Sequence, residues 1–173
     1  MKTTITGIKY FFVALCMALI FSACDPCEGV VCDYGTCGNG ICVCEKGYER
    51  SDTECLPINE RYVNPEDSAV IATYVVIDAN GGRRTYNNIG YVLQASKDVP
   101  YSFTLTNFNF LNDNNITFEI SPTNYSLLVP STVTTAIGKS YACEGSKTDN
   151  NVNLKIVDTG TQYTYLITYQ RAR

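Results

Sequence analysis

Cysteine spacing constrains this chain more than any other feature. Of the nine cysteines, all but Cys16 and Cys143 fall within residues 24–55. Six of them, from Cys27 to Cys55, follow the spacing C-x4-C-x4-C-x4-C-x-C-x10-C. So short a segment has little room for a hydrophobic core, so the spacing predicts a disulfide framework formed in an oxidising compartment. Spacing alone leaves every pairing of the six cysteines open.

The first residues have the pattern of an export signal. Lys2 and Lys9 precede an apolar run over residues 10–21, YFFVALCMALIF. This run is shorter than the roughly 20 apolar residues that span a bilayer, which predicts a cleaved signal peptide over residues 1–23. Ser22 and Ala23 then precede Cys24. A C-x-x-C pair of Cys24 with Cys27, either redox-active or half of a zinc site, is the alternative use of this cysteine.

The small residues before Cys24 resemble the bacterial lipobox, in which the cysteine becomes the lipid-carrying N-terminus. The resemblance implies that Cys24 is lipidated and that the mature protein is a lipoprotein of a Gram-negative bacterium, tethered in the cell envelope. A diacylglycerol group plus an N-acyl chain is enough for stable anchoring. We expect the outer membrane as the location.

The cysteine framework ends in a second recognisable pattern. Cys42-Val43-Cys44 is followed by Glu45-Lys46-Gly47-Tyr48, which spells C-x-C-x-x-G-Y. This pattern resembles an epidermal-growth-factor-like (EGF-like) module, and the resemblance covers Cys27 to Cys55. A zinc cluster is the alternative, although zinc ligands usually occur as two closely spaced pairs. The resemblance implies three disulfides: Cys27 with Cys37, Cys32 with Cys42, and Cys44 with Cys55.

The remaining chain divides into a linker and an all-β domain. Residues 56–68 mix prolines with charges and predict a linker. Over residues 69–173 apolar residues alternate with polar ones, as in Val152, Leu154 and Ile156, and turn signals recur between the runs. This predicts a mainly β domain of about eight strands, arranged as an antiparallel meander barrel, with a β-sandwich as the alternative. A change of aromatic parity after Leu105 predicts a β-bulge near Thr106 and Asn107.

Further residues of this domain resemble a known family. An aromatic-asparagine strand near Phe108 and a Leu-Val-Pro strand end at Pro130 lead into paired hydroxyl and aromatic strands. This order resembles small lipocalin-like (calycin) domains of bacterial lipoproteins. The chain has no tryptophan and so lacks the Gly-x-Trp signature of lipocalins. The resemblance implies a barrel.

Charge and composition exclude several function classes. The net charge is -4, and removing Lys2 and Lys9 with the signal brings it to -6 (-4 minus 2). An acidic chain has no electrostatic footprint for nucleic acid. The chain has no histidine, so the usual general base and the common metal-binding imidazole are missing. We therefore expect no metal and no cofactor.

Few residues qualify for catalysis. Cys143 has no histidine to form its thiolate, so we expect a small buried hydrophobe there. Glu119 and Glu144 could form the carboxylate pair of a glycoside hydrolase, but both are expected to point outward from alternating strands. The sequence therefore predicts a protein that is not an enzyme, with a carboxylate hydrolase as the weaker alternative.

The composition of the strands favours binding. Tyrosines among asparagines can form a surface for stacking sugars. We therefore expect a membrane-anchored envelope lipoprotein whose all-β domain binds a glycan or protein partner. A carrier that holds a small apolar ligand inside the barrel is the alternative. Asp67-Ser68-Ala69 resembles an O-glycosylation site of exported proteins from Gram-negative anaerobes, which makes Ser68 a candidate for modification.

Overall fold

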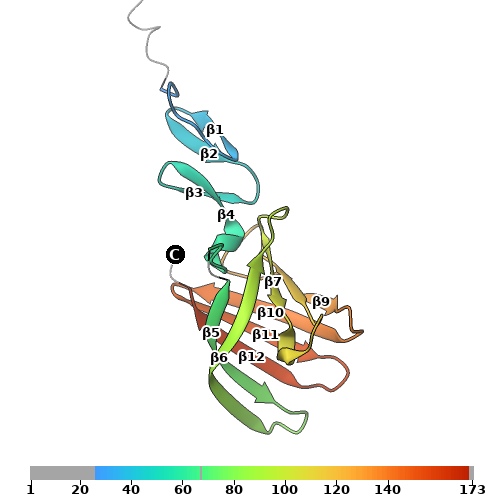
Figure 1. Ribbon diagram of the computed structural model, residues 1–173. Coiled ribbons are helices and arrows are strands. Elements are labelled where there is room, and N and C mark those ends of the chain that lie inside the picture. Colours follow the sequence, from blue (N-terminus) through green and yellow to red (C-terminus); the bar gives the residue numbers. More distant parts are fainter. Residues whose placement is uncertain (1–25, 67, 172–173) are drawn as a thin grey trace, which may run out of the picture. The chain divides into compact units, whose positions relative to one another are not determined.

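A computed structural model describes residues 26–66 and 68–171 of the chain (Figure 1). It separates a disulfide-rich unit, residues 26–45 and 50–55, from a larger β unit, residues 46–49 and 56–171. Nearly all regular structure in both is antiparallel β, as the sequence predicts. Two short 3-10 turns, η1 (Ile58–Arg61) and η2 (Phe108–Phe110), are the helical elements of the described residues.

Short strands and tight turns build the disulfide-rich region. Strand β1 (Gly35–Gly38) pairs with β2 (Ile41–Cys44), and β3 (Tyr48–Ser51) pairs with β4 (Glu54–Pro57). Asn39 and Gly40 connect the first two strands with φ angles of 53° and 78°. Two consecutive left-handed residues form the turn that matches the twist of a hairpin, and asparagine followed by glycine is the favoured pair for it.

Three disulfides hold this region. They join Cys27 to Cys37, Cys32 to Cys42, and Cys44 to Cys55, which is the pairing implied by the resemblance stated above. In the described part of this unit only Cys42 and Cys55 are buried, and both are cross-linked. The cross-links therefore take the place of a hydrophobic core.

The larger unit is an eight-stranded antiparallel sheet that curls into a nearly closed barrel. Apart from β8 and β9, each strand pairs with its neighbour in the chain, and the last strand pairs with the first, so the topology is the predicted meander barrel and not a sandwich. The strands are β5 (Ala69–Ile77), β6 (Arg83–Ala95), β7 (Ser102–Thr106), β8 (Ile116–Glu119), β9 (Ser131–Thr134), β10 (Ser140–Thr148), β11 (Asn151–Asp158) and β12 (Thr164–Gln170).

The barrel has one weak junction, a seam between β8 and β9. These strands lack a continuous ladder and are joined by an isolated bridge between Ile120 and Leu128. Beside it, the N–H of Val129 donates to the carbonyl of Glu119 at 2.8 Å. Every other pair of neighbouring strands shares a ladder of hydrogen bonds, so the seam is where the barrel stops short of closure.

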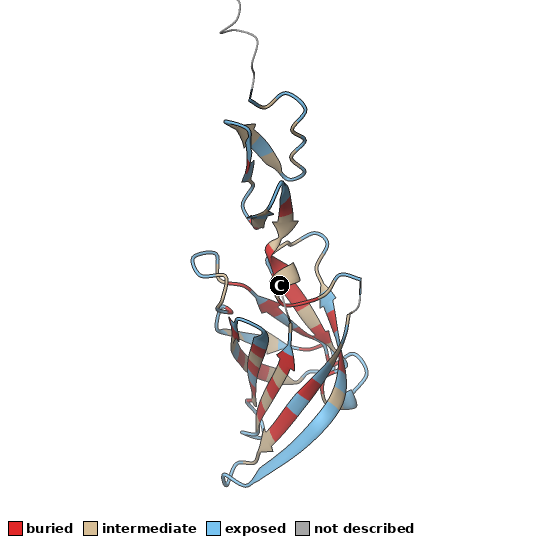
Figure 2. Cartoon of the chain, turned by 90° about the vertical axis from the view of Figure 1, so that its left-hand side faces the viewer, coloured by how far each residue is buried: buried red, intermediate tan, exposed pale blue. Residues whose placement is uncertain are grey.

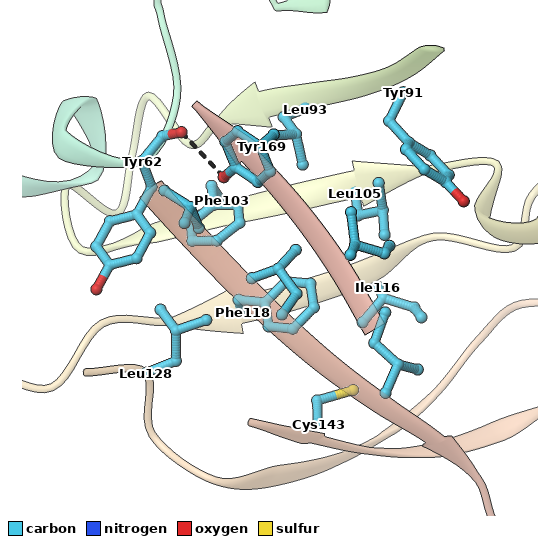
Figure 3. Close-up of a cluster of buried hydrophobic side chains, with 14 of the residues drawn as sticks. Tyr62, Tyr91, Leu93, Phe103, Leu105, Ile116, Phe118, Leu128, Cys143 and Tyr169 are labelled. Carbon is cyan, nitrogen blue, oxygen red and sulfur yellow. Dashed lines mark hydrogen bonds between the residues drawn. The ribbon is translucent and has the colours of Figure 1, made fainter. Parts of the chain in front are cut away.

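Alternating residues fill the barrel interior. In β11 the side chains of Val152, Leu154 and Ile156 are buried, which confirms the period-two prediction for this strand. Figure 3 shows buried side chains gathered in the interior, among them Phe103 of β7 and Phe118 of β8, which are paired across adjacent strands and whose rings stack at 5.3 Å. Eight strands leave an interior just wide enough for side chains. The core of this barrel is therefore made of its own residues.

Part of the segment predicted as a linker belongs to this core. Ile58, Tyr62 and Val63 are buried, and the Tyr62 ring stacks on Phe103 at 5.3 Å. The hydroxyl of Tyr169 donates to the Tyr62 carbonyl at 3.0 Å (Figure 3). The prolines and charges around these residues made the segment look like a linker in the sequence. In the structure it covers one end of the barrel. We call this the entry end, because the chain enters the barrel there.

The prediction of a β-bulge near Thr106 and Asn107 is wrong. Strand β7 ends at Thr106, and Asn107 adopts φ 49° and turns the chain into η2. The register shift of the sheet lies between Ala72 and Tyr74 of β5, opposite Asn88 of β6, which has φ 58°. The parity change after Leu105 therefore marks the end of a strand.

Candidate functional site

Aromatic side chains gather at the end of the barrel opposite the entry end, which we call the tyrosine end. Along β12, Tyr169 contacts Tyr62 of the entry end, whereas Tyr165 lies near the start of the strand and stacks on Tyr74. The buried members of the tyrosine end are Tyr74, Tyr91, Phe108, Tyr141 and Tyr165, and the exposed ones are Tyr86, Phe110 and Tyr163.

A long hairpin supplies much of this end. Strand β6 extends past β7, which pairs only with its last four residues, Val92–Ala95, and the first six residues of β6 are exposed (Figure 2). Tyr86 pairs with Tyr74, and Arg84 pairs with Val76, so all four lie on the face that continues the barrel interior. The hairpin therefore carries an interior-facing surface out to solvent.

The tip of the hairpin is fixed by its own side chain. The Asp78 Oδ1 atom accepts hydrogen bonds from the N–H groups of Asn80, at 2.9 Å, and Gly82, at 2.8 Å. Gly81, between them, has φ 85°. A carboxylate that binds the backbone two residues on is typical of aspartate in turns. This turn sets the position of the residues that follow it in β6.

Tyr74 connects the aromatic rings. Its ring centroid lies 6.0 Å from Tyr86, 5.9 Å from Tyr91 and 6.0 Å from Tyr165. Tyr91 in turn stacks on Phe110 at 6.2 Å, and Tyr165 lies 6.5 Å from Tyr163. Each exposed ring therefore rests against a buried one. Packing of this kind restricts ring motion and presents the exposed rings in a defined arrangement.

The exposed rings form a substantial apolar surface. Tyr86 is 42% exposed, Tyr163 39% and Phe110 69%. Single exposed aromatics are ordinary, but a group of three on one end of a domain marks a candidate binding surface. The two tyrosines add hydroxyl groups to this surface, so it is amphipathic.

Phe110 is held outward by a strained loop. Asn107, Asn109, Phe110 and Asp113 all have positive φ angles, 59° in the case of Phe110. A bulky residue in this conformation is rare and persists only where its surroundings enforce it. Here the hydroxyl of Tyr74 donates to Asn109 Oδ1. Strain of this kind is often found at binding sites.

Further hydrogen bonds fix the same loop. The N–H of Asn107 donates to Asn115 Oδ1 at 2.9 Å, and the N–H of Asp113 donates to Asn107 Oδ1 at 3.2 Å. The buried Asn114 amide donates to the Phe108 carbonyl, at 2.8 Å, and to the Tyr141 hydroxyl, at 3.0 Å. The loop is thus tied both to itself and to β10.

The buried hydroxyls of this end serve as neutral groups. Burial raises the pKa of Tyr74, and the neighbouring tyrosines Tyr91, Tyr165 and Tyr86 raise it further. Burial also raises the pKa of Tyr91, whose hydroxyl lies beside Tyr74 without a well-formed hydrogen bond to any described residue. Both hydroxyls therefore stay protonated at neutral pH and can donate hydrogen bonds.

A small hollow lies at the base of the hairpin tip. It has a volume of about 110 Å³ and is lined by Val76, Asp78, Gly82, Arg84, Tyr86 and Tyr163. Two exposed rings, a carboxylate and a guanidinium thus converge on one place. The hollow is small, so it suits part of a larger ligand that also rests on the exposed rings.

The two candidate catalytic carboxylates lie at separate places. Glu119 lines a cavity of about 180 Å³ together with Tyr101, Pro122 and Tyr125. Glu144 lines a groove of about 510 Å³ on the outer face of the barrel, where its Oε1 accepts a hydrogen bond from Lys155 Nζ at 2.5 Å. The structure therefore does not bring the two residues together in either cavity.

Cys143 occupies the position expected from the alternation of β10. It is 3% exposed, and burial raises the pKa of its thiol to about 12. Its Sγ atom lies 3.7 Å from the Tyr141 carbonyl. The thiol therefore remains protonated at neutral pH and packs as part of the core.

Of the modification sites predicted from sequence, Ser68 lies among the described residues and Cys24 does not. Ser68 is half-buried just before β5, and its carbonyl accepts a hydrogen bond from Leu93 N–H at 2.8 Å. Asp67 of the same motif, Cys24 and the predicted signal over residues 1–23 lie outside the described residues. Over residues 26–66 and 68–171, no helix has the length and apolarity needed to cross a membrane.

Sequence reasoning indicated the kind of side chain at the tyrosine end but missed its members. The signal that could have found them is asparagine or glutamine beside an aromatic residue at a chain reversal. Phe110 follows Asn109, and Tyr163 follows Gln162, which has φ 61°. Tyr86 precedes Asn87 and Asn88 at the register shift. In each case the amide residue permits a turn that leaves the ring exposed.

The described residues contain no group of three or more histidine, cysteine, aspartate or glutamate side chains placed to hold a metal ion. No family model, curated protein or solved structure matches the chain. The chemistry of the tyrosine end therefore carries the functional argument.

Proposed function

We propose that this protein is an envelope lipoprotein, anchored through Cys24, whose barrel binds a glycan at the tyrosine end. An EGF-like module over Cys27 to Cys55 would serve as the spacer between anchor and barrel. The observation that carries the proposal is the cluster of exposed rings, Tyr86, Phe110 and Tyr163, held against buried rings beside polar groups.

Sugars suit this combination of groups. The C–H faces of a sugar ring stack on aromatic side chains, while its hydroxyl groups need donors and acceptors around the ring. Tyr86 and Tyr163 supply the faces, and the hollow beside them contains Asp78 and Arg84. Because the exposed rings already rest on buried ones, little side-chain entropy is lost on binding.

The barrel interior favours a surface ligand over an internal one. The space between the strands is occupied by a continuous cluster of buried side chains that includes Leu93, Leu105, Ile116 and Phe118 (Figure 3). A carrier of an apolar ligand would need an interior free of such side chains. Binding on the tyrosine end needs no rearrangement of this core.

Hydrolysis of the glycan has less support than binding. Glycoside hydrolases place two carboxylates roughly 5 to 10 Å apart across one bond. Glu119 and Glu144 line separate cavities, and Glu144 is paired with Lys155. We therefore propose recognition without turnover.

A glycan array tests the proposal. The full chain carrying Cys24→Ala, which prevents lipidation, should bind a subset of glycans. Tyr86→Ala and Tyr163→Ala should each weaken this binding about tenfold, the size of one lost aromatic stacking contact. Tyr101→Ala is the matched control, because Tyr101 is 38% exposed and lines a different cavity. An array without hits, or equal losses in Tyr101→Ala, would refute glycan binding at this end.

Anchoring is tested separately in the native host. Wild-type protein should fractionate with outer membranes, and Cys24→Ala should release it into the soluble fraction, because the lipid is the expected attachment. If the variant stays with the membranes as wild type does, the assignment of Cys24 as anchor is wrong. This result is independent of the array.

A further inference from the structure

Arg84 lines the hollow of the tyrosine end and forms none of the ion pairs found among the described residues. It is exposed on β6, directly opposite Val76 of β5. Among the described residues, ion pairs join Arg61 to Glu49, Lys139 to Asp158 and Lys155 to Glu144, and none of them includes Arg84. Its guanidinium is therefore available to a ligand.

The nearest carboxylate in the hollow is engaged elsewhere. Asp78 Oδ1 accepts two backbone hydrogen bonds of the hairpin tip, from Asn80 and Gly82. The other oxygen lies close over Gly82, where an added Cβ would come within 2.4 Å of it. The turn, and not an ion pair with Arg84, therefore fixes Asp78. Its free oxygen can accept a hydrogen bond from a ligand hydroxyl.

The surroundings of Arg84 suit an oxyanion carried on a ring. A guanidinium donates two parallel hydrogen bonds to a carboxylate or sulfate, and Tyr86 and Tyr163 flank it with aromatic faces. The chain as a whole has net charge -4, so it does not attract polyanions at long range. Recognition of an anion here would depend on short-range contacts with both charge and ring.

We propose that the tyrosine end is specific for acidic glycans, with Arg84 binding a carboxylate or sulfate ester on a sugar ring that stacks on Tyr86 or Tyr163. Asp78 accepts a hydrogen bond from a neighbouring hydroxyl. This inference rests on the proposed glycan binding and names the class of sugar that the site selects.

Matched pairs on one array test the specificity. Each uronic-acid oligosaccharide is printed beside its carboxyl-reduced neutral counterpart, and each sulfated oligosaccharide beside its unsulfated parent. The full chain with Cys24→Ala should bind the acidic member about tenfold more tightly, the scale of a charge-assisted hydrogen bond. The kind of pair that shows the difference identifies the anion.

Variants assign the preference to one side chain. Arg84→Ala should abolish the preference, and Arg84→Lys should restore only part of it, because an ammonium lacks the planar pair of donors. Arg83→Ala is the control, since Arg83 is its exposed neighbour on the opposite face of β6 and should leave the preference unchanged. Both positions are exposed, so the barrel should fold in each of the three variants.

The outcomes separate this inference from the function on which it rests. If neutral and acidic members bind equally and binding still needs Tyr86, glycan binding stands and the role of Arg84 is wrong. If Arg83→Ala and Arg84→Ala reduce the preference equally, the anion is bound by general charge and the inference is overturned. If no glycan of either kind binds, both proposals fail.

Discussion

The two units of this chain use cysteine in opposite ways. In the disulfide-rich unit, residues 26–45 and 50–55, the buried residues are Cys42 and Cys55, and each is cross-linked. In the barrel, Cys143 is a free thiol among buried apolar side chains. The first unit is ordered by restricting its unfolded chain, and the second by removing apolar surface from water. The two should therefore fail under different conditions.

Reduction should produce the largest difference between the two. Each disulfide contributes about 2 to 4 kcal/mol, and the small region has no core to replace it. Under a reductant at neutral pH, limited proteolysis with mass spectrometry should show cleavage within residues 26–55. The barrel strands from β5 onward should stay intact, because none of them carries a disulfide. Cleavage throughout β5 to β12 under the same conditions would contradict separate stabilisation.

A core truncation should break the barrel instead. Phe103 is fully buried and stacks on both Tyr62 and Phe118 at 5.3 Å. Phe103→Ala should lower the free energy of unfolding by about 3 to 5 kcal/mol, since it removes a large side chain and leaves a cavity. Guanidinium denaturation measures the loss.

The control for this truncation is Ile71→Ala on the same barrel. Ile71 is 65% exposed, so its truncation should cost about 0.5 kcal/mol or less. A loss below about 1.5 kcal/mol in Phe103→Ala would mean that the interior is loosely packed, contrary to the structure.

A smaller effect should follow from the buried carboxylate of Asp158, at the end of β11. Burial alone would raise the pKa of Asp158, but the N–H groups of Thr161 and Gly160, and the Lys139 ammonium, together hold it below its ordinary value. A lowered pKa in the folded state means that this stabilisation is present above the pKa of the unfolded chain. It is lost as the pH falls through the folded-state pKa.

Asp158→Asn tests this sign. The variant keeps an oxygen for the two N–H groups and loses the charge, so it should cost about 1 kcal/mol at pH 7. The difference from wild type should persist from neutral pH down to about pH 5 and should disappear as the pH falls through the lowered folded-state pKa of Asp158. Chemical denaturation across this range measures it. A difference that grows toward acid pH would show that the carboxylate is destabilising.

Cys143 should show the smallest response. Its thiol is buried and has a pKa of about 12, so iodoacetamide at pH 8 should leave it unmodified in the folded protein. In denaturant the same thiol should react fully. Mass spectrometry of the peptide that contains Cys143 distinguishes the two states. Rapid alkylation without denaturant would place this part of β10 at the surface.

Local patterns explain which parts of the fold follow from sequence. A spacing of two residues places Val152, Leu154 and Ile156 on one face of a strand whatever the strand pairs with. Successive strands joined by short turns then favour a meander. The barrel was predictable for this reason, and its core positions on β11 with it.

Parts that depend on distant contacts were not predictable. Tyr62 is buried because it stacks on Phe103 and accepts a hydrogen bond from Tyr169, and Val63 beside it is buried as well. The sequence of residues 56–68 contains no pattern that indicates either contact. The sequence around Asn107 was interpreted as a bulge, whereas the chain reverses direction there. A bulge and a chain reversal both shift the alternation of inward and outward side chains, so the sequence pattern does not distinguish them.

The members of the tyrosine end meet only through the strand register. Tyr86, Phe110 and Tyr163 are far apart in the chain, and each touches a different buried tyrosine. Sequence reasoning could name aromatic residues as binding candidates, but it could not choose among those on different faces of the sheet. That choice requires the pairing of β5 with both β6 and β12.

The seam between β8 and β9 has a kinetic consequence. The first and last strands, β5 and β12, are fully paired, whereas the two consecutive strands at the seam share an isolated bridge. The seam has fewer hydrogen bonds between strands than the other junctions of the barrel, so it should open first. In the native state the amides of β8 and β9 should exchange with deuterium through local opening, while those of β12 wait for global unfolding. The barrel would then open locally between two consecutive strands, away from its chain ends.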